Sequence, residues 1–312
     1  MTHTQAVKFR SDQERLFEFM HLPFPYRRPK SQWLPRPNRN KILSLSDPHV
    51  QFHNRVVFSH ALKNEKDAAT LVVPGDLGDY YSKSRFKKTR VVPFNQELRA
   101  VFFILEWMAT NWRDVRIMIG NHDNRPEKHL LNTLGSEIDL LIITEANMLK
   151  QLAAYFDNVR LVGTQLDKTD INLTHIYQHG DIIFTHGEIS LKANSANLDR
   201  VQTYLSDWGG LLNLRPWRVI AQGHNHRDTI DSSGPYKRFL LPTASNPFSP
   251  GFEYIYSSRM IGRPPSIGYS IFYQYNGETD CNGSKNVIFP VRHGRTEPLP
   301  VYDAKGRREA DS

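Results

Sequence analysis

Five short polar clusters combine aspartate, histidine and asparagine, which are the side chains that bind borderline divalent metal ions. The clusters are Asp47-Pro48-His49, Gly75-Asp76-Leu77-Gly78-Asp79, Gly120-Asn121-His122-Asp123, Thr185-His186-Gly187 and Gly223-His224-Asn225-His226. Such a mixed donor set suits Mn, Fe, Zn or Ni. Because the chain has a single cysteine, a structural zinc site built on thiolates is excluded.

A rigid frame must hold these clusters, and the apolar run before each of them is typical of a buried strand. The runs cover residues 42–46, 70–73, 115–119, 181–185 and 217–221. Apolar residues at helical spacing predict a helix over 95–112, which makes a strand–helix–strand crossover with the strands on either side. Because strand ends are where binding residues converge in α/β sheets, we expect the clusters to meet.

The rest of the chain predicts further helices and strands around this frame. The expected helices cover 143–156 and 196–208, and the expected strands cover 159–162, 172–177, 236–241, 267–275 and 286–291. Five prolines between 22 and 41 exclude a regular helix or a central strand there. The predicted organisation is therefore a basic Pro/Arg-rich arm over 1–41, one domain over 42–302 and a polar tail over 303–312.

The charge of the 312-residue chain is uneven along its length. The formal net charge is +8, and residues 1–41 carry nine basic groups against three acidic ones. Such an excess favours polyanionic partners, and solvated surface is the alternative. Long uninterrupted apolar stretches and a signal-peptide core are both absent from the sequence, so we expect a soluble, cytoplasmic protein without a membrane partner. Cys281 has no partner for an internal disulfide, which agrees with a reducing compartment.

The five clusters, each after an apolar strand, resemble the signature of the calcineurin-like metallophosphoesterase superfamily over roughly residues 41–244. The resemblance implies an α/β fold, namely a four-layer αββα sandwich of two mixed β-sheets flanked by helices, with two metal ions at the carboxyl ends of the strands. It also implies seven metal ligands, which are Asp47, His49 and His226 on the first ion, Asp76 on both ions, and Asn121, His186 and His224 on the second. His175 and His179 are close enough in sequence to compete with His186.

The chemistry of such a centre explains the residue types. Two divalent ions about 3.5 to 4 Å apart lower the pKa of a bridging water and clamp the phosphoryl oxygens during in-line attack. By the resemblance, His122 lies beside the substrate phosphate, where it would protonate the leaving oxygen or stabilise phosphoryl charge. Asp79 is a candidate to orient that imidazole. Arg125 is a candidate for a bidentate phosphate contact, and an exposed arginine at a helix start is the alternative.

The motifs fit none of the well-known branches of the superfamily throughout. Ser/Thr protein phosphatases usually have Arg where this chain has Tyr80 and Glu where it has Asp123, so that activity is disfavoured. DNA-repair exonucleases of the superfamily typically have His at the position of Asp79. Cyclic-nucleotide phosphodiesterases tend to have a His-His-Pro-Pro-like fourth motif where this chain reads 185–188 as Thr-His-Gly-Glu. Taken as a set, the five motifs are similar to those of phosphoesterases encoded by bacteria and their phages.

A second basic cluster follows the Asp76 motif and bears on the substrate. It consists of Lys83, Arg85, Lys87, Lys88 and Arg90. Within it Arg85, Lys87 and Lys88 are candidate contacts for a phosphate backbone, and a plain surface loop is the alternative. If this loop and the N-terminal arm, with Tyr26 and Trp33 available for stacking, line one groove, the substrate is a single-stranded or duplex nucleic acid.

We therefore expect a dinuclear-metal phosphoesterase, with manganese as the first choice of metal, that hydrolyses phosphodiester bonds by a metal-bridging hydroxide. Nucleic acid or nucleotides are the expected substrates, which would make the enzyme a nuclease or phosphodiesterase. One alternative is a small-molecule phosphomonoesterase or cyclic-nucleotide phosphodiesterase. The other is a catalytically silent nucleic-acid-binding protein on the same fold, against which the retention of all seven candidate ligands argues.

Overall fold

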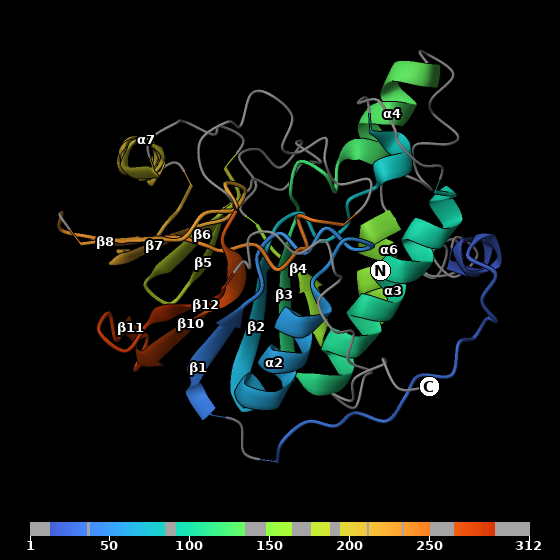
Figure 1. Ribbon diagram of the computed structural model, residues 1–312, viewed down its shortest axis with the longest axis horizontal. Coiled ribbons are helices and arrows are strands. Elements are labelled where there is room, and N and C mark those ends of the chain that lie inside the picture. Colours follow the sequence, from blue (N-terminus) through green and yellow to red (C-terminus); the bar gives the residue numbers. More distant parts are fainter. Residues whose placement is uncertain are drawn as a thin grey trace.

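The computed structural model describes residues 13–35, 38–84, 92–134, 148–163, 176–187, 194–210, 212–232, 234–249 and 265–290. In this part of the chain two mixed β-sheets lie face to face, with helices on the outer side of each (Figure 1). The predicted four-layer αββα sandwich is confirmed. The strand–helix–strand crossover is also confirmed, because the two strands around the helix pair in parallel.

The first sheet places four parallel strands side by side. They are β1 (Asn38–Ser44), β2 (Ala68–Pro74), β3 (Asp114–Met118) and β4 (Val159–Leu161). On the other side of β1, antiparallel pairing adds β10 (Ile267–Tyr275), which in turn pairs with β11 (Glu278–Thr279) and β12 (Lys285–Phe289). The parallel strands all end at the same edge, so the residues that follow them meet there.

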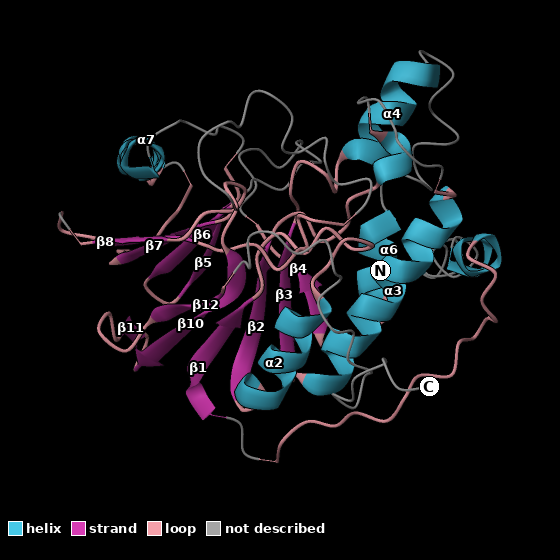
Figure 2. Cartoon of the chain, viewed as in Figure 1, coloured by secondary structure: helices cyan, strands magenta, loops and turns pink. Residues whose placement is uncertain are grey.

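The second sheet has the order β5-β6-β7-β9-β8 among the described strands. Its strands are β5 (Ile176–His179), β6 (Ile182–Thr185), β7 (Val219–Gln222), β8 (Thr229–Asp231) and β9 (Lys237–Leu240). The three central strands are parallel, and the two edge strands are antiparallel to their neighbours. Figure 2 shows the strands of both sheets with the helices on their outer sides. His186 after β6 contacts Asn121, and His224 after β7 contacts Asp47, so the strand ends of the two sheets meet.

Three apolar clusters hold the layers together. The largest packs the helices α2 (Arg55–Glu65), α3 (Phe94–Asn111) and α6 (Met148–Ala154) on the outer face of the first sheet. The second joins the two sheets and includes Val72, Phe184 and Phe272. The third packs α7 (Asn194–Trp208) on the outer face of the second sheet, with Leu205 against Ile220. Burial of these faces drives the layering, because each element is apolar on the side that it covers.

Most predicted elements appear close to the expected positions. The strand over 267–275 has the expected bounds, and the helix expected over 95–112 spans Phe94–Asn111. The helix predicted over 143–156 spans Met148–Ala154, and residues 135–147 lie outside the described part. The strand predicted over 172–177 corresponds to β5, which begins at Ile176. Residues 164–175 also lie outside the described residues.

The helix α2, the helix α4 (Arg125–Leu134) and a helical stretch over residues 13–19 were not predicted from the sequence. The helix α2 begins after Asn54, whose side-chain Oδ1 accepts hydrogen bonds from the backbone N–H of Val56 and Val57. This capping bond satisfies two of the N–H groups that a helix start leaves without a partner. The helix α4 follows the Asn121 cluster directly. Strand β8 was not predicted either, and its three residues are too short for a clear pattern.

The N-terminal segment contributes to the core. Leu16, Phe17 and Met20 are buried in the largest cluster, and residues 22–35 run on without a regular element, as the prolines predict. The boundary between arm and domain at residue 41 stays a prediction, as does the tail over 303–312, which lies outside the described residues.

A common groove of the arm and the basic cluster stays a prediction, because residues 85–91 lie outside the described residues. Phe19 of the arm lies at the start of α3, with its ring centroid 6.2 Å from that of Phe94. The ring of Trp33 lies at the end of α3, where its Nε1 donates to the carbonyl of Ala109 at 2.8 Å. Lys83 lies at the start of the same helix, with Nζ 4.7 Å from the ring of Phe94. A helix of 18 residues separates the two ends by about 27 Å. Tyr26 packs edge-on against Phe102, at 5.2 Å between ring centroids, instead of standing free for stacking.

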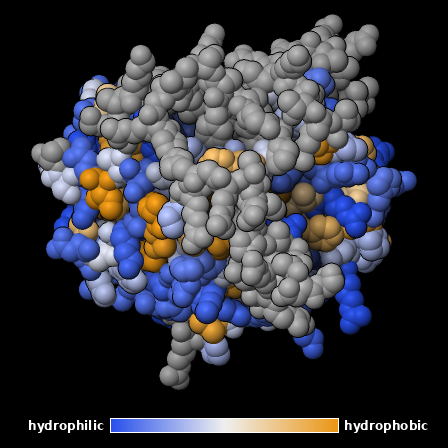
Figure 3. Space-filling model, in the orientation of Figure 1, coloured by the Kyte–Doolittle hydropathy of each residue, from blue (hydrophilic) through white to orange (hydrophobic). Residues whose placement is uncertain are grey.

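The surface carries scattered apolar side chains. On the face in Figure 3 the apolar patches alternate with hydrophilic surface. Among the described residues, no helix is both long enough and apolar enough to cross a membrane.

Candidate metal centre

The five polar clusters meet at the carboxyl edge of both sheets. Loops after β1, β2 and β3 bring the first three clusters, and loops after β6 and β7 bring the other two. Several candidate ligands have a left-handed backbone, which costs non-glycine residues free energy and marks functional loops. These residues are Asp47 (φ 50°), His49 (φ 45°), Asp76 (φ 51°), His224 (φ 73°) and His226 (φ 52°).

One half of the centre is built around Asp47. Its carboxylate is buried and accepts hydrogen bonds from the backbone N–H of His224, at 3.0 Å to each oxygen, and from the hydroxyl of Ser46. Nε2 of His226 lies 3.5 Å from Oδ1 of Asp47. Nε2 of His49 faces Nε2 of His226 at 3.1 Å. Two imidazole nitrogens and a carboxylate oxygen therefore point at one small volume.

The other half is built around Asp76. Its Oδ1 accepts the backbone N–H of His122 at 2.7 Å, and its Oδ2 lies 3.3 Å from Nε2 of His186. The same Nε2 lies 3.0 Å from Oδ1 of Asn121. Nδ1 of His186 donates to the carbonyl of Pro74 at 2.9 Å, so Nε2 is the ring atom that faces the two oxygens.

This donor set fits divalent metal ions. Ligand atoms of Asp47, His49 and His226 lie within 4.8 Å of one another, and so do those of Asp76, His186 and His224. A third set, His49, Asp76 and His122, lies as close together. Ring nitrogens and carboxylate oxygens at these distances either share a proton or bind a common cation. The first two sets follow the division into two ions that the resemblance implies, whereas the third includes His122, which the resemblance places beside the phosphate. Asp76 is also within reach of His49, at 3.8 Å.

The pKa values of Asp47, Asp76 and His186 reflect the opposite charges that lie close together in the centre. Burial alone would raise the pKa of Asp47 and of Asp76, but the neighbouring histidines hold both below their usual range. Burial lowers the pKa of His186, and the carboxylates of Asp76 and Asp47 outweigh it and raise that pKa to about 10. The pKa of His224 falls to about 3, chiefly through burial and the charge on His186. A metal ion would satisfy the carboxylates in place of these protons.

Asp79 holds two histidines of the centre. Its Oδ1 lies 2.9 Å from Nδ1 of His122 and 3.2 Å from Nδ1 of His49. Burial would raise the pKa of Asp79, but hydrogen bonds from both histidines keep it far below its usual range. Because the carboxylate accepts at both Nδ1 atoms, the Nε2 atoms of His49 and His122 are the ones turned toward the centre. The geometry agrees with the predicted orientation of His122 by Asp79.

Arg125 lies against this pair instead of standing free at a helix start. Its Nη1 donates to the carbonyl of Asp79 at 2.8 Å and lies 3.4 Å from Oδ2 of the same residue. Its Nη2 lies 2.9 Å from Nε2 of His122. Burial and the charge on Arg125 together lower the pKa of His122 to about 4, against the pull of Asp76. A phosphate contact by Arg125 stays a prediction.

Asp123 has a role that the sequence did not indicate. Its carboxylate accepts backbone N–H groups from Leu77 at 3.2 Å, from Gly78 at 2.9 Å and from Gly120 at 2.9 Å. It thereby ties the Asp76 loop to the Asn121 loop. Burial and the charge on Asp76 raise its pKa to about 7. The sequence distinguishes Asp123 only as a residue that replaces the Glu of protein phosphatases. Its hydrogen bonds to backbone N–H groups could not be predicted, because such contacts produce no sequence pattern.

The remaining predicted substrate contacts, Arg85, Lys87 and Lys88, lie outside the described residues.

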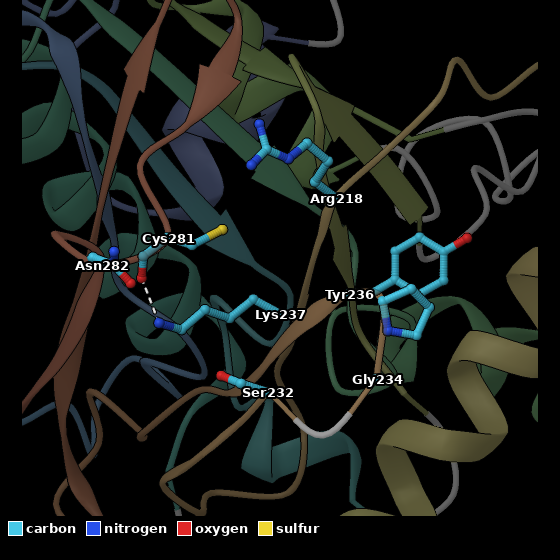
Figure 4. A pocket seen from close by; sticks show the side chains of 8 residues that line it. Arg218, Ser232, Gly234, Tyr236, Lys237, Cys281 and Asn282 are labelled. Carbon is cyan, nitrogen blue, oxygen red and sulfur yellow. Dashed lines mark hydrogen bonds between the residues drawn. The ribbon is translucent and has the colours of Figure 1, made fainter.

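A pocket of about 240 Å³ lies at the opposite strand ends, away from the centre (Figure 4). Arg218 comes just before β7 and Lys237 begins β9, whereas His224 follows β7. Nζ of Lys237 donates to the carbonyl of Cys281. Burial raises the pKa of the Cys281 thiol, so this cysteine lacks the thiolate character of a nucleophile.

Comparison with known proteins matches the model of the calcineurin-like phosphoesterase family to residues 40–249. No curated protein matches the chain.

Among solved structures, the chain is similar to an archaeal phosphodiesterase at 12% identity, with 80% of this chain and 99% of the other covered and a TM-score of 0.39. Vps29 of Entamoeba histolytica complexed with Zn²⁺ matches at 14% identity, with 80% and 99% covered and a TM-score of 0.38. A hypothetical protein of Pyrococcus horikoshii matches at 9% identity, with 82% and 89% covered and a TM-score of 0.42.

Proposed function

Because the chain belongs to the calcineurin-like phosphoesterase family, we propose that it is a divalent-metal-dependent phosphodiesterase acting on nucleic acid or nucleotides. The observation that carries the metal dependence is the 3.1 Å approach of Nε2 of His49 to Nε2 of His226 beside the buried Asp47. Two ring nitrogens this close either share a proton or bind the same cation, and Asp47 adds the carboxylate oxygen of a metal site. Manganese is the first metal to test, since it accepts both carboxylate and imidazole ligands.

Seven side chains would bind the two metal ions. Asp47, His49 and His226 would hold one ion, Asn121, His186 and His224 the other, and Asp76 would contact both. When bound, two such ions acidify a water molecule and neutralise the phosphoryl oxygens.

His122 is the proposed proton donor to the leaving oxygen of the phosphodiester. At neutral pH it is uncharged, because its pKa lies near 4. Its Nδ1 is fixed on Asp79 and its Nε2 accepts from Nη2 of Arg125, so Nε2 reaches the substrate once Arg125 turns to the phosphate. A phosphate beside Nε2 adds negative charge, which raises the pKa of His122 and favours a proton on Nε2. From there the leaving oxygen takes its proton.

The substrate class rests on charge. The chain carries a net charge of +8, and Lys83 ends the short 3₁₀-helix η1 (Tyr81–Lys83) that follows Asp79. Arg85, Lys87 and Lys88 follow in the sequence. A row of cations that starts beside a phosphoesterase centre favours a substrate with several phosphates over one with a single phosphate.

The test compares a single-stranded DNA or RNA oligonucleotide with a cyclic mononucleotide, each with Mn²⁺ at low and at physiological salt. We expect KM for the oligonucleotide to rise steeply with salt, and turnover of the mononucleotide to be slower and nearly insensitive to salt. Asp76→Ala is the control for a contaminating nuclease and should be inactive on both.

Each contrary result favours a different function. Faster and salt-insensitive turnover of the mononucleotide would contradict the nucleic-acid substrate and favour a small-molecule enzyme. Salt-sensitive oligonucleotide binding with bound Mn²⁺ but without turnover of either substrate would contradict the enzyme and favour a silent binding protein.

A further inference from the structure

A buried carboxylate outside the candidate centre contacts two of its loops. Glu97 lies in the first turn of α3 with 1% of its surface exposed. Its oxygens lie 3.2 Å and 3.1 Å from the backbone N of Ser82. They also accept hydrogen bonds from the hydroxyl of Ser82 and from Nε2 of Gln51. Both oxygens are therefore held by donors, and these donors come from two different loops.

The two loops are those that carry the first two polar clusters. Gln51 is two residues from His49, and Ser82 is three residues from Asp79. Close to the ligands the loops are joined directly, because the backbone N–H of His49 donates to the carbonyl of Asp76 at 3.0 Å. The backbone N–H of Val50 likewise donates to the carbonyl of Leu77 at 2.8 Å. Glu97 adds a further contact beyond these, because it joins Gln51 and Ser82 at the far ends of the two loops.

Two residues of these loops have a left-handed backbone conformation that contacts from outside the loops must stabilise. Gln51 has a φ of 86°, and Tyr80, next to Asp79, has a φ of 48°. Residues in this region persist only where the surroundings stabilise them. The helix α3 is a firm support, because its neighbouring Leu98 and Val101 are buried in the largest apolar cluster.

The contacts also explain why a carboxylate is required at this position. Ser82 presents a backbone N–H and Gln51 presents an amide N–H, so the group between them must accept from both sides. A carboxylate accepts at both oxygens, whereas a glutamine would turn its own NH₂ toward one of these donors. Replacing Glu97 by glutamine is therefore a nearly isosteric change that breaks one side of the joint.

We propose that Glu97 is a positioning residue of the metal centre, which sets the distance between the loop that carries His49 and the loop that carries Asp76 and Asp79. The proposal rests on the proposed function in that it needs the centre to bind metal. Substitution of Glu97 then weakens metal binding although Glu97 contacts no metal ligand. Residues that orient the ligands of a metal typically contribute 10- to 100-fold in affinity.

The experiment is calorimetric titration of the metal-free protein with Mn²⁺, in wild type and in Glu97→Gln. We expect the variant to bind Mn²⁺ about 10-fold to 100-fold more weakly. Glu106→Gln is the matched control, because Glu106 lies on the same helix, is partly buried and interacts with Tyr26 instead of with the loops. Its affinity for Mn²⁺ should equal that of the wild type.

Gln51→Ala tests the same joint from the other side. It removes the contact to the His49 loop and leaves the bonds of Glu97 to Ser82 in place, so it should also weaken Mn²⁺ binding without unfolding the chain. Thermal unfolding of each metal-free variant checks that the fold persists. Normal Mn²⁺ affinity in folded Glu97→Gln and Gln51→Ala would overturn the positioning role alone. A wild type that binds no Mn²⁺ would overturn the proposed function together with it.

Discussion

Nδ1 of His122 lies 2.9 Å from Oδ1 of Asp79, and the same oxygen lies 3.2 Å from Nδ1 of His49. One carboxylate thus orients a candidate metal ligand and the candidate proton donor at the same time. A change at Asp79 should therefore alter two observables together, which are metal affinity and the rate of the chemical step.

Asp79→Asn keeps the shape of the side chain but removes the negative charge that both imidazoles face. We expect kcat to fall by about 100-fold or more, because His122 loses its fixed orientation. We expect Mn²⁺ affinity to fall by about 10-fold, because His49 loses its hydrogen-bond acceptor. Steady-state kinetics and calorimetric titration measure the two effects. A variant with reduced kcat and unchanged Mn²⁺ affinity would show that Asp79 serves His122 alone.

Gly120→Ala should disable the centre through backbone contact. A Cβ at this position would overlap the backbone N and the carboxylate of Asp76, neither of which can move away cheaply. We expect loss of measurable Mn²⁺ binding. Gly210→Ala is the matched control, because a Cβ there meets nothing within 4 Å. Retained Mn²⁺ binding in Gly120→Ala would contradict the close packing of the two loops.

Metal should stabilise the folded protein through Asp76. Any ligand that binds only the folded state raises the free energy of unfolding, by about 2.7 kcal/mol at 100 times its Kd. Thermal unfolding with Mn²⁺ and after chelation should show this gain in the wild type. Asp76→Ala should show none of it, because the variant loses the carboxylate that contacts both candidate sites. An equal gain in the variant would place the metal elsewhere.

The pH dependence of stability should report on Glu97. Burial raises its pKa to about 7 from an ordinary 4.5, although hydrogen bonds from Ser82 and Gln51 lower it. The folded state therefore holds this proton more tightly than the unfolded chain. The resulting stabilisation is fully present below pH 4.5 and is lost as the pH rises through about 7.

The measurement is the free energy of unfolding by urea between pH 4 and pH 8, in wild type and in Glu97→Gln. The difference between the two should change by about 3 kcal/mol over this range, with the wild type losing more stability as the pH rises. A difference independent of pH would mean that Glu97 has an ordinary pKa.

Much of the centre could be predicted from the sequence, because its ligands directly follow strands whose apolar runs are easy to identify. Asp47 and Asp76 each come after such a run, and the parallel pairing of β1 with β2 brings them to one edge. The contacts that orient the ligands could not be predicted. Asp123 and Glu97 act on backbone groups of loops distant in sequence, and no local pattern records such contacts.

The helix α2 shows a second limit of prediction from sequence. Its apolar residues Val57, Phe58 and Ala61 are buried, but polar residues follow closely and weaken the periodicity. Its capping residue, Asn54, is a residue type that marks helix starts and could have been used to predict α2. The placement of Trp33 at the end of α3 depends on tertiary packing, which no local sequence pattern records.

The central claim is metal-dependent cleavage of phosphodiesters at this centre. The most direct test is hydrolysis of bis(p-nitrophenyl) phosphate beside the monoester p-nitrophenyl phosphate, after chelation and re-addition of Mn²⁺, in wild type, His122→Ala and Asp76→Ala. We predict that the wild type cleaves the diester faster than the monoester only with Mn²⁺, and that both variants lose this activity. Diester cleavage that survives chelation, or that persists in Asp76→Ala, would contradict the claim.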